Sequence, residues 1–387
     1  MKKIYLATLL ASSILADESE ILTQTRQDII KLQKDQIDEK EKVNKYDWVT
    51  DINLNADLSN NQDTQENENY SISLSQDIFK FGGISAQIDY AKELKRLEDL
   101  DLTISTKEDL NTLYNYILDI KLNEISIKQN ILNIKNAQID IEEKKSEYKA
   151  GELSISDLND AIMTKNSLRE TYETLLLTKQ KNINALKQYT NTNYDQIPLP
   201  KFTLIEENDY IQNSTAIQYA TINKEVTNLS YAMKKSEYLP TLSLNTQYGY
   251  KKSEEVVGNE YYEYGLNLTV PLSFISSNDM AQSKLEYLTS KKKLEQEFVD
   301  QKSFYDEVVM SIKSNHSKIK LANEDIQLYH DLLEVNVEEF NAGYKTQDDI
   351  TILENSQNIR KLDIHTYKIN IEKLLLSLYT KNLANIY

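Results

Sequence analysis

Four short segments of the chain alternate strictly between apolar and polar residues, which is the pattern of a β-strand with two unlike faces. In one of them Leu242 and Leu244 alternate with Ser243 and Asn245. The pattern predicts strands at about residues 47–58, 69–80, 239–250 and 261–273. Each is long enough for a tilted membrane-crossing strand, which needs roughly 9–11 residues. The sequence therefore predicts two amphipathic hairpins.

Elsewhere the apolar residues recur at alternating steps of three and four, as in coiled-coil helices. One seam contains Leu110, Leu113, Ile117, Ile120, Ile127, Ile131, Ile134 and Ile141. A second contains Ile350, Leu353, Ile364, Tyr367, Ile371, Leu374 and Leu378. The pattern predicts helices at about residues 82–149, 155–190, 208–237, 277–341 and 347–384. At 1.5 Å per residue, the first of these would reach about 100 Å.

The two halves of the chain repeat each other. Ala150-Gly151 recurs as Ala342-Gly343, 192 residues later, and the strand patterns recur at nearly the same offset. A constant offset over several features indicates a tandem duplication. We expect a first repeat at residues 17–197 and a second at 198–387, with Pro198 and Pro200 at the joint. Each repeat is expected to contain a helix, two strands, a long helix, a turn and a helix.

The first sixteen residues differ from the rest. Lys2 and Lys3 precede a mainly apolar stretch at residues 4–15, and Ala16 stands before acidic residues. This order is typical of a secretory signal peptide, so we expect residues 1–16 to be removed on export. No later segment has the composition of a transmembrane helix, so a membrane span of the mature protein would consist of strands.

Composition supports long helices and gives no sign of a catalytic site. The 387 residues include only 7 Gly and 4 Pro, which are the residues that destabilise helix interiors. The formal charge of −17 argues against a nucleic-acid partner, because phosphate binding needs clustered Lys and Arg. There is no Cys, and the three His stand apart in helical sequence without a metal-binding spacing. We therefore expect no catalytic residue, metal or cofactor.

Two turns carry similar chemistry. Gly151 and Gly343 each follow a predicted helix, where a left-handed residue is common. Ser154 precedes Asp157 by three residues, as Thr346 precedes Asp349, and both pairs resemble a capping box with Asp in place of Glu. Helix capping is one interpretation of both aspartates, and a functional role is the other. Capping does not account for Asp160, one helical turn further along.

Taken together, these features resemble the TolC-type outer-membrane efflux proteins. The resemblance rests on the order of duplicated amphipathic hairpins, long heptad helices and the turns Tyr148-Lys149-Ala150-Gly151 and Phe340-Asn341-Ala342-Gly343. It implies a mainly α fold with transmembrane β structure. It further implies a homotrimer with a 12-stranded β-barrel, four strands from each chain, and an α-helical barrel that extends into the periplasm.

The resemblance also implies a function. The protein would be the outer-membrane exit duct of a tripartite efflux or type I secretion system, set in outer-membrane lipid. Its partners would be a periplasmic adaptor (membrane fusion protein) and an inner-membrane transporter of RND, ABC or MFS type. An alternative is a periplasmic coiled-coil adaptor or structural protein. That alternative explains the heptads but not the two hairpins.

In this family, rings of acidic residues surround the constricted periplasmic mouth, and a basic residue of the turn links neighbouring helices there. The matching basic residue here is Lys345, and the matching first acid is Asp349. Ile352 stands at the second acid position, where Asp348 is a substitute close by. By the same resemblance, Lys345 would pair with Asp157 to hold the mouth shut. The residues expected at the aperture are Asp157, Asp160, Lys345, Asp348 and Asp349.

Overall fold

The computed structural model describes residues 19–61, 65–252 and 258–383, so the predicted signal peptide lies outside the described residues. The chain forms two compact units. Unit 1 comprises the chain up to Ile29, Thr103–Ser214 and the chain from Gln301. Unit 2 comprises Ile30–Leu102 and Thr215–Asp300. Two long helices, α3 (Gly83–Ala150) and α7 (Ser276–Asn341), contribute residues to both units.

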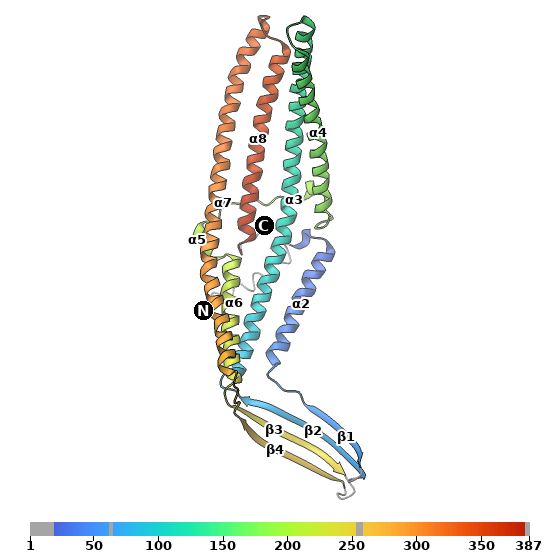
Figure 1. Ribbon diagram of the computed structural model, residues 1–387, viewed down its shortest axis with the longest axis vertical. Helices are drawn as coiled ribbons and strands as arrows, with labels where there is room; N and C mark the ends of the chain where they lie inside the picture. The colour runs from blue at the N-terminus through green and yellow to red at the C-terminus, as the bar shows by residue number, and fades with distance from the viewer. Residues whose placement is uncertain (1–18, 62–64, 253–257, 384–387) are drawn as a thin grey trace. The chain divides into compact units, whose positions relative to one another are not determined.

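Unit 2 contains one antiparallel sheet of four strands, in the order β1-β2-β3-β4 (Figure 1). The strands are β1 (Asn53–Asn61), β2 (Gln65–Phe79), β3 (Thr241–Lys252) and β4 (Asn259–Thr269). The pairing of β2 with β3 joins the two hairpins, with Ser71 opposite Gly249. β1 and β4 therefore form the two open edges of the sheet.

The prediction that the first strand begins at residue 47 was wrong, because the ladder begins at Asn53. The side chain of Gln76 takes the place of a strand partner before that point. Its Oε1 accepts from the Thr50 N–H at 3.0 Å, and its Nε2 donates to the Trp48 carbonyl at 3.0 Å. The fourth strand ends at Thr269 rather than at 273, before Pro271, which has no N–H for a ladder.

The remaining helices are α2 (Gln24–Tyr46), α4 (Ile155–Leu186), α5 (Glu207–Gln212), α6 (Thr215–Glu237) and α8 (Gln347–Thr380). Two 3₁₀ turns lie at Ser19–Ile21 and Tyr194–Gln196. α4 and α8 each end four residues before the predicted boundary. Within the described ranges, no helix combines the length and apolar character that crossing a membrane requires.

The single helix predicted at 208–237 is two helices, α5 and α6, separated at Asn213 and Ser214. The interruption has a tertiary cause. The Asn213 carbonyl accepts from the Leu383 N–H at 2.8 Å, and Ser214 forms an isolated β-bridge with Asn382. These backbone bonds to the end of the chain replace continuation of the helix.

In unit 1 the long helices lie side by side in the order α4, α3, α8, α7 (Figure 1). An ion pair joins each pair of neighbours: Lys179–Glu124 at 2.7 Å, Lys373–Asp119 at 2.7 Å and Arg360–Asp325 at 3.2 Å. A core cluster of buried side chains includes Tyr210, Tyr305, Val308 and Leu378. α4 and α7 are therefore the two outer members of the row.

The predicted heptad seam of α3 is covered along only part of its length. Leu110, Leu113, Ile117 and Ile120 are 0% exposed. Ile131, further toward the turn, is 38% exposed. One chain thus packs the first half of the seam and leaves the second half incompletely covered.

Lys107 is a charged residue inside unit 1, with only 2% of its surface exposed. Its ammonium donates to the carbonyl of Asn382 at 2.7 Å, just beyond the C-terminal end of α8. A cation at this end of a helix complements the helix dipole and its unpaired carbonyls. The Lys107 hydrogen bond therefore links α3 to the C-terminal end of α8.

Replacing Lys107 by Met should lower the free energy of unfolding of unit 1 by about 1–3 kcal/mol, the usual contribution of a buried hydrogen bond to a charged group. Thermal unfolding followed by circular dichroism measures the loss. The hydrogen-exchange rate of the Leu383 backbone N–H should also rise. The matched control is Lys313→Met on the exposed side of α7, which should change stability by less than about 0.5 kcal/mol. Equal effects of the two substitutions would contradict the role of Lys107.

Candidate functional site

One face of the sheet is apolar and uncovered by the described residues. The register aligns Leu54 with Ile72, Tyr248 with Tyr262, and Leu244 with Leu266. Their exposed fractions are high; Leu54, for example, is 79% exposed, and Tyr264 on the same face is 81% exposed. A water-soluble protein rarely leaves a contiguous apolar surface of this kind bare. This face is suited to contact with lipid or with another apolar surface.

The opposite face is polar and internally hydrogen-bonded across strands. The Ser75 hydroxyl donates to Asn245 Oδ1 at 2.6 Å, and the Ser243 hydroxyl donates to Asp77 Oδ1 at 2.6 Å. Tyr261 accepts from Gln247 through its hydroxyl at 3.1 Å and donates to Asn69 at 3.2 Å. A polar face of this kind is compatible with a water-filled channel wall.

Gly249 has a packing role on this polar face. A Cβ at that position would lie 2.7 Å from the Tyr261 ring and 2.7 Å from the Tyr70 carbonyl oxygen. Only glycine therefore lets the Tyr261 ring lie over the strand while it reaches Asn69. The Tyr261 ring therefore lies close to the backbone of β3 on the polar face.

The second candidate region is the pair of turns in unit 1, which Figure 1 shows at the same end of the row of helices. Gly151 and Gly343 have φ angles of +78° and +84°, which favour glycine. The N–H groups of Glu152 and Tyr344 donate to Glu147 and Glu339, six-to-one bonds that define a Schellman motif. The chain therefore reverses direction after α3 and after α7 through the same type of turn.

The helices that follow the turns are capped unequally. Thr346 and Asp349 form a complete capping box: the Asp349 carboxylate accepts from the Thr346 N–H at 2.9 Å, and the Asp349 N–H donates to the Thr346 hydroxyl at 3.2 Å. At the other turn the Asp157 N–H donates to Ser154 at 3.3 Å, and the Ser154 hydroxyl donates to Asp157 at 2.6 Å. Capping thus accounts for part of what both aspartates do.

The five predicted aperture residues lie at these two turns. Asp157, Asp160, Lys345 and Asp348 are exposed, and Asp349 is half-buried. In the part of the single chain that the structure describes, no ion pair joins Lys345 to Asp157. The Thr346 N–H and hydroxyl lower the pKa of Asp349, and the charge of Lys345 adds to the effect. Within one chain, Lys345 therefore acts on its own turn.

Glu143, near the end of α3, belongs to the same region and was missed by the sequence analysis. Partial desolvation raises its pKa, and the negative charges of Asp349, Asp140, Asp348 and Glu147 raise it further. The acidic residues at 140, 143 and 147 follow the three-and-four spacing of one helix face, a signal the sequence contains. That spacing alone does not reveal that α8 lies opposite.

Replacing Glu143 by Gln should stabilise the turn region at neutral pH. A carboxyl group whose pKa is raised by folding opposes folding when it is ionised. This unfavourable contribution is lost as pH falls through the raised pKa toward the ordinary value of 4.5. Asp349 has the opposite sign, since its lowered pKa makes stability fall only below about 3.8.

Thermal unfolding between pH 4.5 and 7 should therefore depend less on pH in Glu143→Gln than in the unmodified protein. Glu142→Gln, one residue away on α3, is the matched control and should keep the original dependence. An unchanged pH profile in the Glu143 variant would show that the neighbouring charges do not affect the Glu143 carboxylate.

Across the described ranges, no group of three or more His, Asp or Glu side chains is placed to hold a metal ion.

Comparison with known proteins identifies the fold. No protein-family model and no curated protein sequence matches the chain. Among solved structures, the outer membrane protein VceC from Vibrio cholerae aligns with a TM-score of 0.72 at 14% identity, over 97% of this chain and 97% of that chain. The Campylobacter jejuni CmeC outer membrane channel aligns with a TM-score of 0.73 at 13% identity, over 96% and 85%.

A membrane protein from Pseudomonas aeruginosa gives a TM-score of 0.73 at 14% identity, over 96% of this chain and 92% of that one. The agreement extends over nearly the whole length of each protein. The chain therefore has the fold of outer-membrane channel proteins: long helices with a small four-stranded antiparallel sheet. The resemblance predicted from the sequence is confirmed at the level of the fold.

Proposed function

We propose that the protein is a passive exit channel in the outer membrane, and that it belongs to the TolC type. The observation that carries the proposal is the sheet, which has an uncovered apolar face, a hydrogen-bonded polar face and two open edges. A strand edge in lipid must be paired, because no water is present to satisfy its backbone groups. The similar fold of the CmeC outer membrane channel supports the same conclusion.

The functional form in this proposal is a homotrimer. β1 of one copy pairs with β4 of the next, so that three copies form a closed barrel of twelve strands. The apolar face contacts outer-membrane lipid, and the polar face lines the channel. The helices continue as an α-helical barrel into the periplasm. The apolar heptad seam of α3, which one chain covers only in part, supports the assembly of several copies, since a single chain leaves Ile131 exposed.

The turns at Gly151 and Gly343 lie at the periplasmic mouth in this proposal. There a periplasmic adaptor and an inner-membrane transporter of RND, ABC or MFS type would supply both cargo and energy, for efflux or for type I secretion. Asp157, Asp160, Lys345, Asp348 and Asp349 surround the aperture. They act through charge and helix capping, and no catalytic step is assigned to them.

The proposal also keeps the tandem duplication, with repeats at residues 17–197 and 198–387. One observation supports it: each repeat supplies one hairpin of the sheet and one Gly turn with the same hydrogen bonds. The two halves of each chain then contribute equivalently to the barrel and to the mouth.

Detergent extraction tests the function directly. The protein should sediment with outer membranes, require detergent for solubility, and have the mass of three chains in detergent. Reconstituted into planar bilayers, it should conduct ions. A stable, water-soluble monomer in the periplasmic fraction would contradict the channel and favour the adaptor or structural alternative.

A further inference from the structure

Helices α3 and α8 lie side by side in unit 1 and are joined by polar pairs along their contact. Three such pairs are Lys373–Asp119 at 2.7 Å, Gln129–Asp363 at 2.8 Å and Asn136–Asn355 at 2.7 Å. The residue numbers rise along α3 as they fall along α8, so the two helices are antiparallel. Each pair contains a hydrogen-bond donor, either an ammonium or a side-chain amide. All three contacts are therefore attractive.

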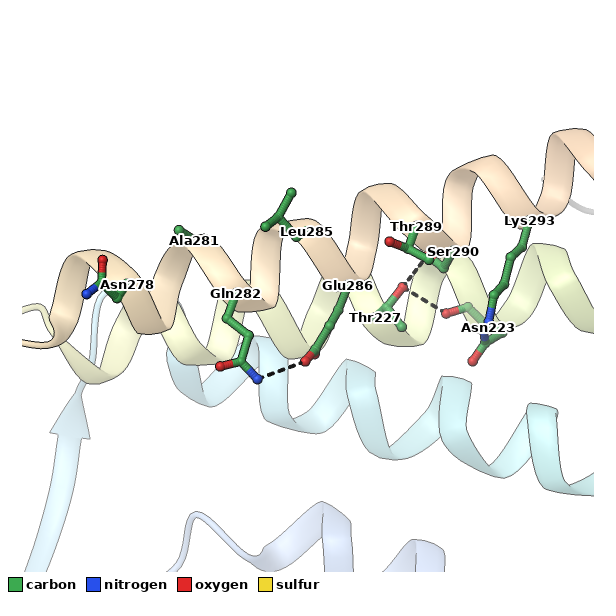
Figure 2. A pocket seen from close by; sticks show the side chains of 10 residues that line it. All are labelled: Asn223, Thr227, Asn278, Ala281, Gln282, Leu285, Glu286, Thr289, Ser290 and Lys293. Carbon is green, nitrogen blue, oxygen red and sulfur yellow. Dashed lines mark hydrogen bonds between the residues drawn. The ribbon is translucent and has the colours of Figure 1, made fainter.

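A helix contact in unit 2 has the same kind of chemistry, as Figure 2 shows. Thr227 of α6 and Ser290 of α7 are hydrogen-bonded through their hydroxyls at 2.6 Å, beside a groove of about 620 Å³. Within α7, the Gln282 amide donates to the Glu286 carboxylate at 3.3 Å. In these examples a polar side chain at a helix surface meets a group of complementary hydrogen-bonding character.

The spacing of the α3–α8 pairs places Glu143 opposite the start of α8. From Gln129 to Asn136 the chain advances by seven residues, about two helical turns, and the partner moves back by eight residues on α8. A further step of seven residues leads to Glu143 on α3 and, before Asn355, to Asp348 on α8. We call Glu143 and Asp348 the terminal pair, because they are the next position of this series and the nearest to the turns.

The terminal pair differs from the other three because both members are carboxylates, which only accept hydrogen bonds when ionised. Partial desolvation raises the pKa of Glu143, and the negative charges of Asp349 and Asp348 raise it further, as expected if the start of α8 is close. The Asp349 carboxylate is bound by the Thr346 N–H and hydroxyl, and Lys345 acts on it within the same turn. Asp348 is thus the α8 carboxylate that remains for Glu143.

The lysines of α3 near the terminal pair are bound to other acids. Lys144 pairs with Asp140 at 3.2 Å, and Lys145 pairs with Glu142 at 3.8 Å. Glu147, one helical turn further along α3, adds a negative charge. Within the described ranges, neither lysine forms an ion pair with the terminal pair. The charges on this end of α3 therefore do not neutralise it.

Helix α4, on the other side of α3, brings a further acid to the same level. Lys165 of α4 donates to Gln138 of α3. Five residues beyond Gln138 is Glu143, and five residues before Lys165 is Asp160. Because α3 and α4 are antiparallel, Asp160 is level with Glu143, and Lys165 is more than one helical turn away. Neither neighbouring helix thus supplies a cation at the level of the terminal pair.

We infer that the terminal pair is a proton-operated clasp, which closes the periplasmic mouth when the periplasm becomes acidic. One carboxyl group takes up a proton from water, and its O–H then donates to the other carboxylate. Repulsion between two anions is replaced by a charge-assisted hydrogen bond, which holds the turn ends of α3 and α8 together. At neutral pH the proton returns to water and the two ends separate. The inference rests on the proposed channel and adds a regulation of its mouth.

The rest of the series does not respond to pH in this way. The side chains of Asn136 and Asn355 do not ionise, and Gln129 keeps its amide donor at every pH. Acid therefore changes the contact between α3 and α8 at the end nearest the turns and leaves the remainder bonded. A local change of charge at a helix contact is a common basis of pH-dependent switching.

Planar-bilayer conductance of the full-length protein tests the clasp, with the pH on the periplasmic side lowered from 7.5 to 4.5. The conductance should fall severalfold, because the raised pKa of Glu143 places its proton uptake above the ordinary value of 4.5. Glu143→Gln should show the low conductance at every pH, since its amide donates to Asp348 without a proton. Glu143→Lys should do the same through an ion pair with Asp348. The matched control, Glu142→Gln, should keep the original pH profile.

A distance measurement gives an independent readout. The natural sequence contains no Cys, so spin labels can be attached at Ser146→Cys on α3 and Gln347→Cys on α8, both exposed and close to the terminal pair. In detergent, with labelled chains diluted by unlabelled ones, the distance between the labels should shorten on acidification. In the Glu143→Gln background it should be short at both pH values.

The outcomes are distinguishable. A channel whose conductance does not respond to pH, or responds equally in Glu143→Gln, would overturn the clasp and leave the proposed function intact. A label distance that shortens in acid without a fall in conductance would show that the terminal pair does not close the mouth. No conductance from the unmodified protein at any pH would overturn both the channel and its regulation.

Discussion

Replacing Leu266 by Arg is expected to abolish insertion of the protein into the outer membrane. Leu266 is 67% exposed in the middle of β4, on the apolar face of the sheet. Arg on the lipid face of a barrel strand costs roughly 2–4 kcal/mol at the bilayer midplane. A trimer incurs that cost in every copy. The variant should accumulate in the periplasm or be degraded, and membrane fractionation measures the change.

The neighbouring residue supplies the control. Asn267 is one position along the same strand, so its side chain is on the polar face. Asn267→Arg should leave insertion intact and alter only the ion preference of the pore in planar bilayers. If the two variants insert equally well, the apolar face does not contact lipid, and the assignment of the two faces is wrong.

Replacing Lys345 by Glu is expected to open the periplasmic mouth. The substitution replaces a positive charge that acts on Asp349 with a negative one, at a turn where Asp348 and Asp349 already act unfavourably on the Glu143 carboxylate. An exposed charge pair contributes under about 1 kcal/mol. Three copies acting together, each contributing up to about 1 kcal/mol, would shift the closed–open equilibrium by up to about a hundredfold, since 1.4 kcal/mol corresponds to a factor of ten. Planar-bilayer conductance should rise accordingly.

Further variants at the two turns distinguish a role in gating from a role in helix capping. Lys345→Gln should give a smaller increase than Lys345→Glu, and Lys149→Glu at the first turn tests whether the position matters. Asp348→Asn should weaken block by divalent cations from the periplasmic side without loss of thermal stability, because Asp348 has no role in the capping box. Asp349→Asn should lower stability. Unchanged conductance and block in the Lys345 and Asp348 variants would place the gate elsewhere.

The sequence predicted the type of each long element well, because strands of period two and heptad helices leave unmistakable patterns. Two of its errors lie where a distant side chain or backbone group determines the boundary. The start of β1 depends on Gln76, which lies opposite in the next strand. The break between α5 and α6 depends on Asn382 and Leu383, near the end of the chain. Local pattern contains no information about either contact.

The turn chemistry was partly predictable for the same reason. Capping boxes are local, so Thr346 and Asp349 could be recognised from their spacing. The role of Glu143 depends on α3 and α8 lying side by side, so it emerges only from the three-dimensional arrangement. The ion pairs between α2 and α3 likewise emerge only from the three-dimensional arrangement.

The unequal caps at the two turns imply that the two helical hairpins do not open with equal ease. α8 begins with reciprocal backbone bonds between Thr346 and Asp349, whereas the single backbone bond from Asp157 to Ser154 starts α4 at 3.3 Å. Fraying of a helix end begins where the fewest backbone groups are satisfied. In the proposed channel, the first turn of α4 should therefore open before the first turn of α8.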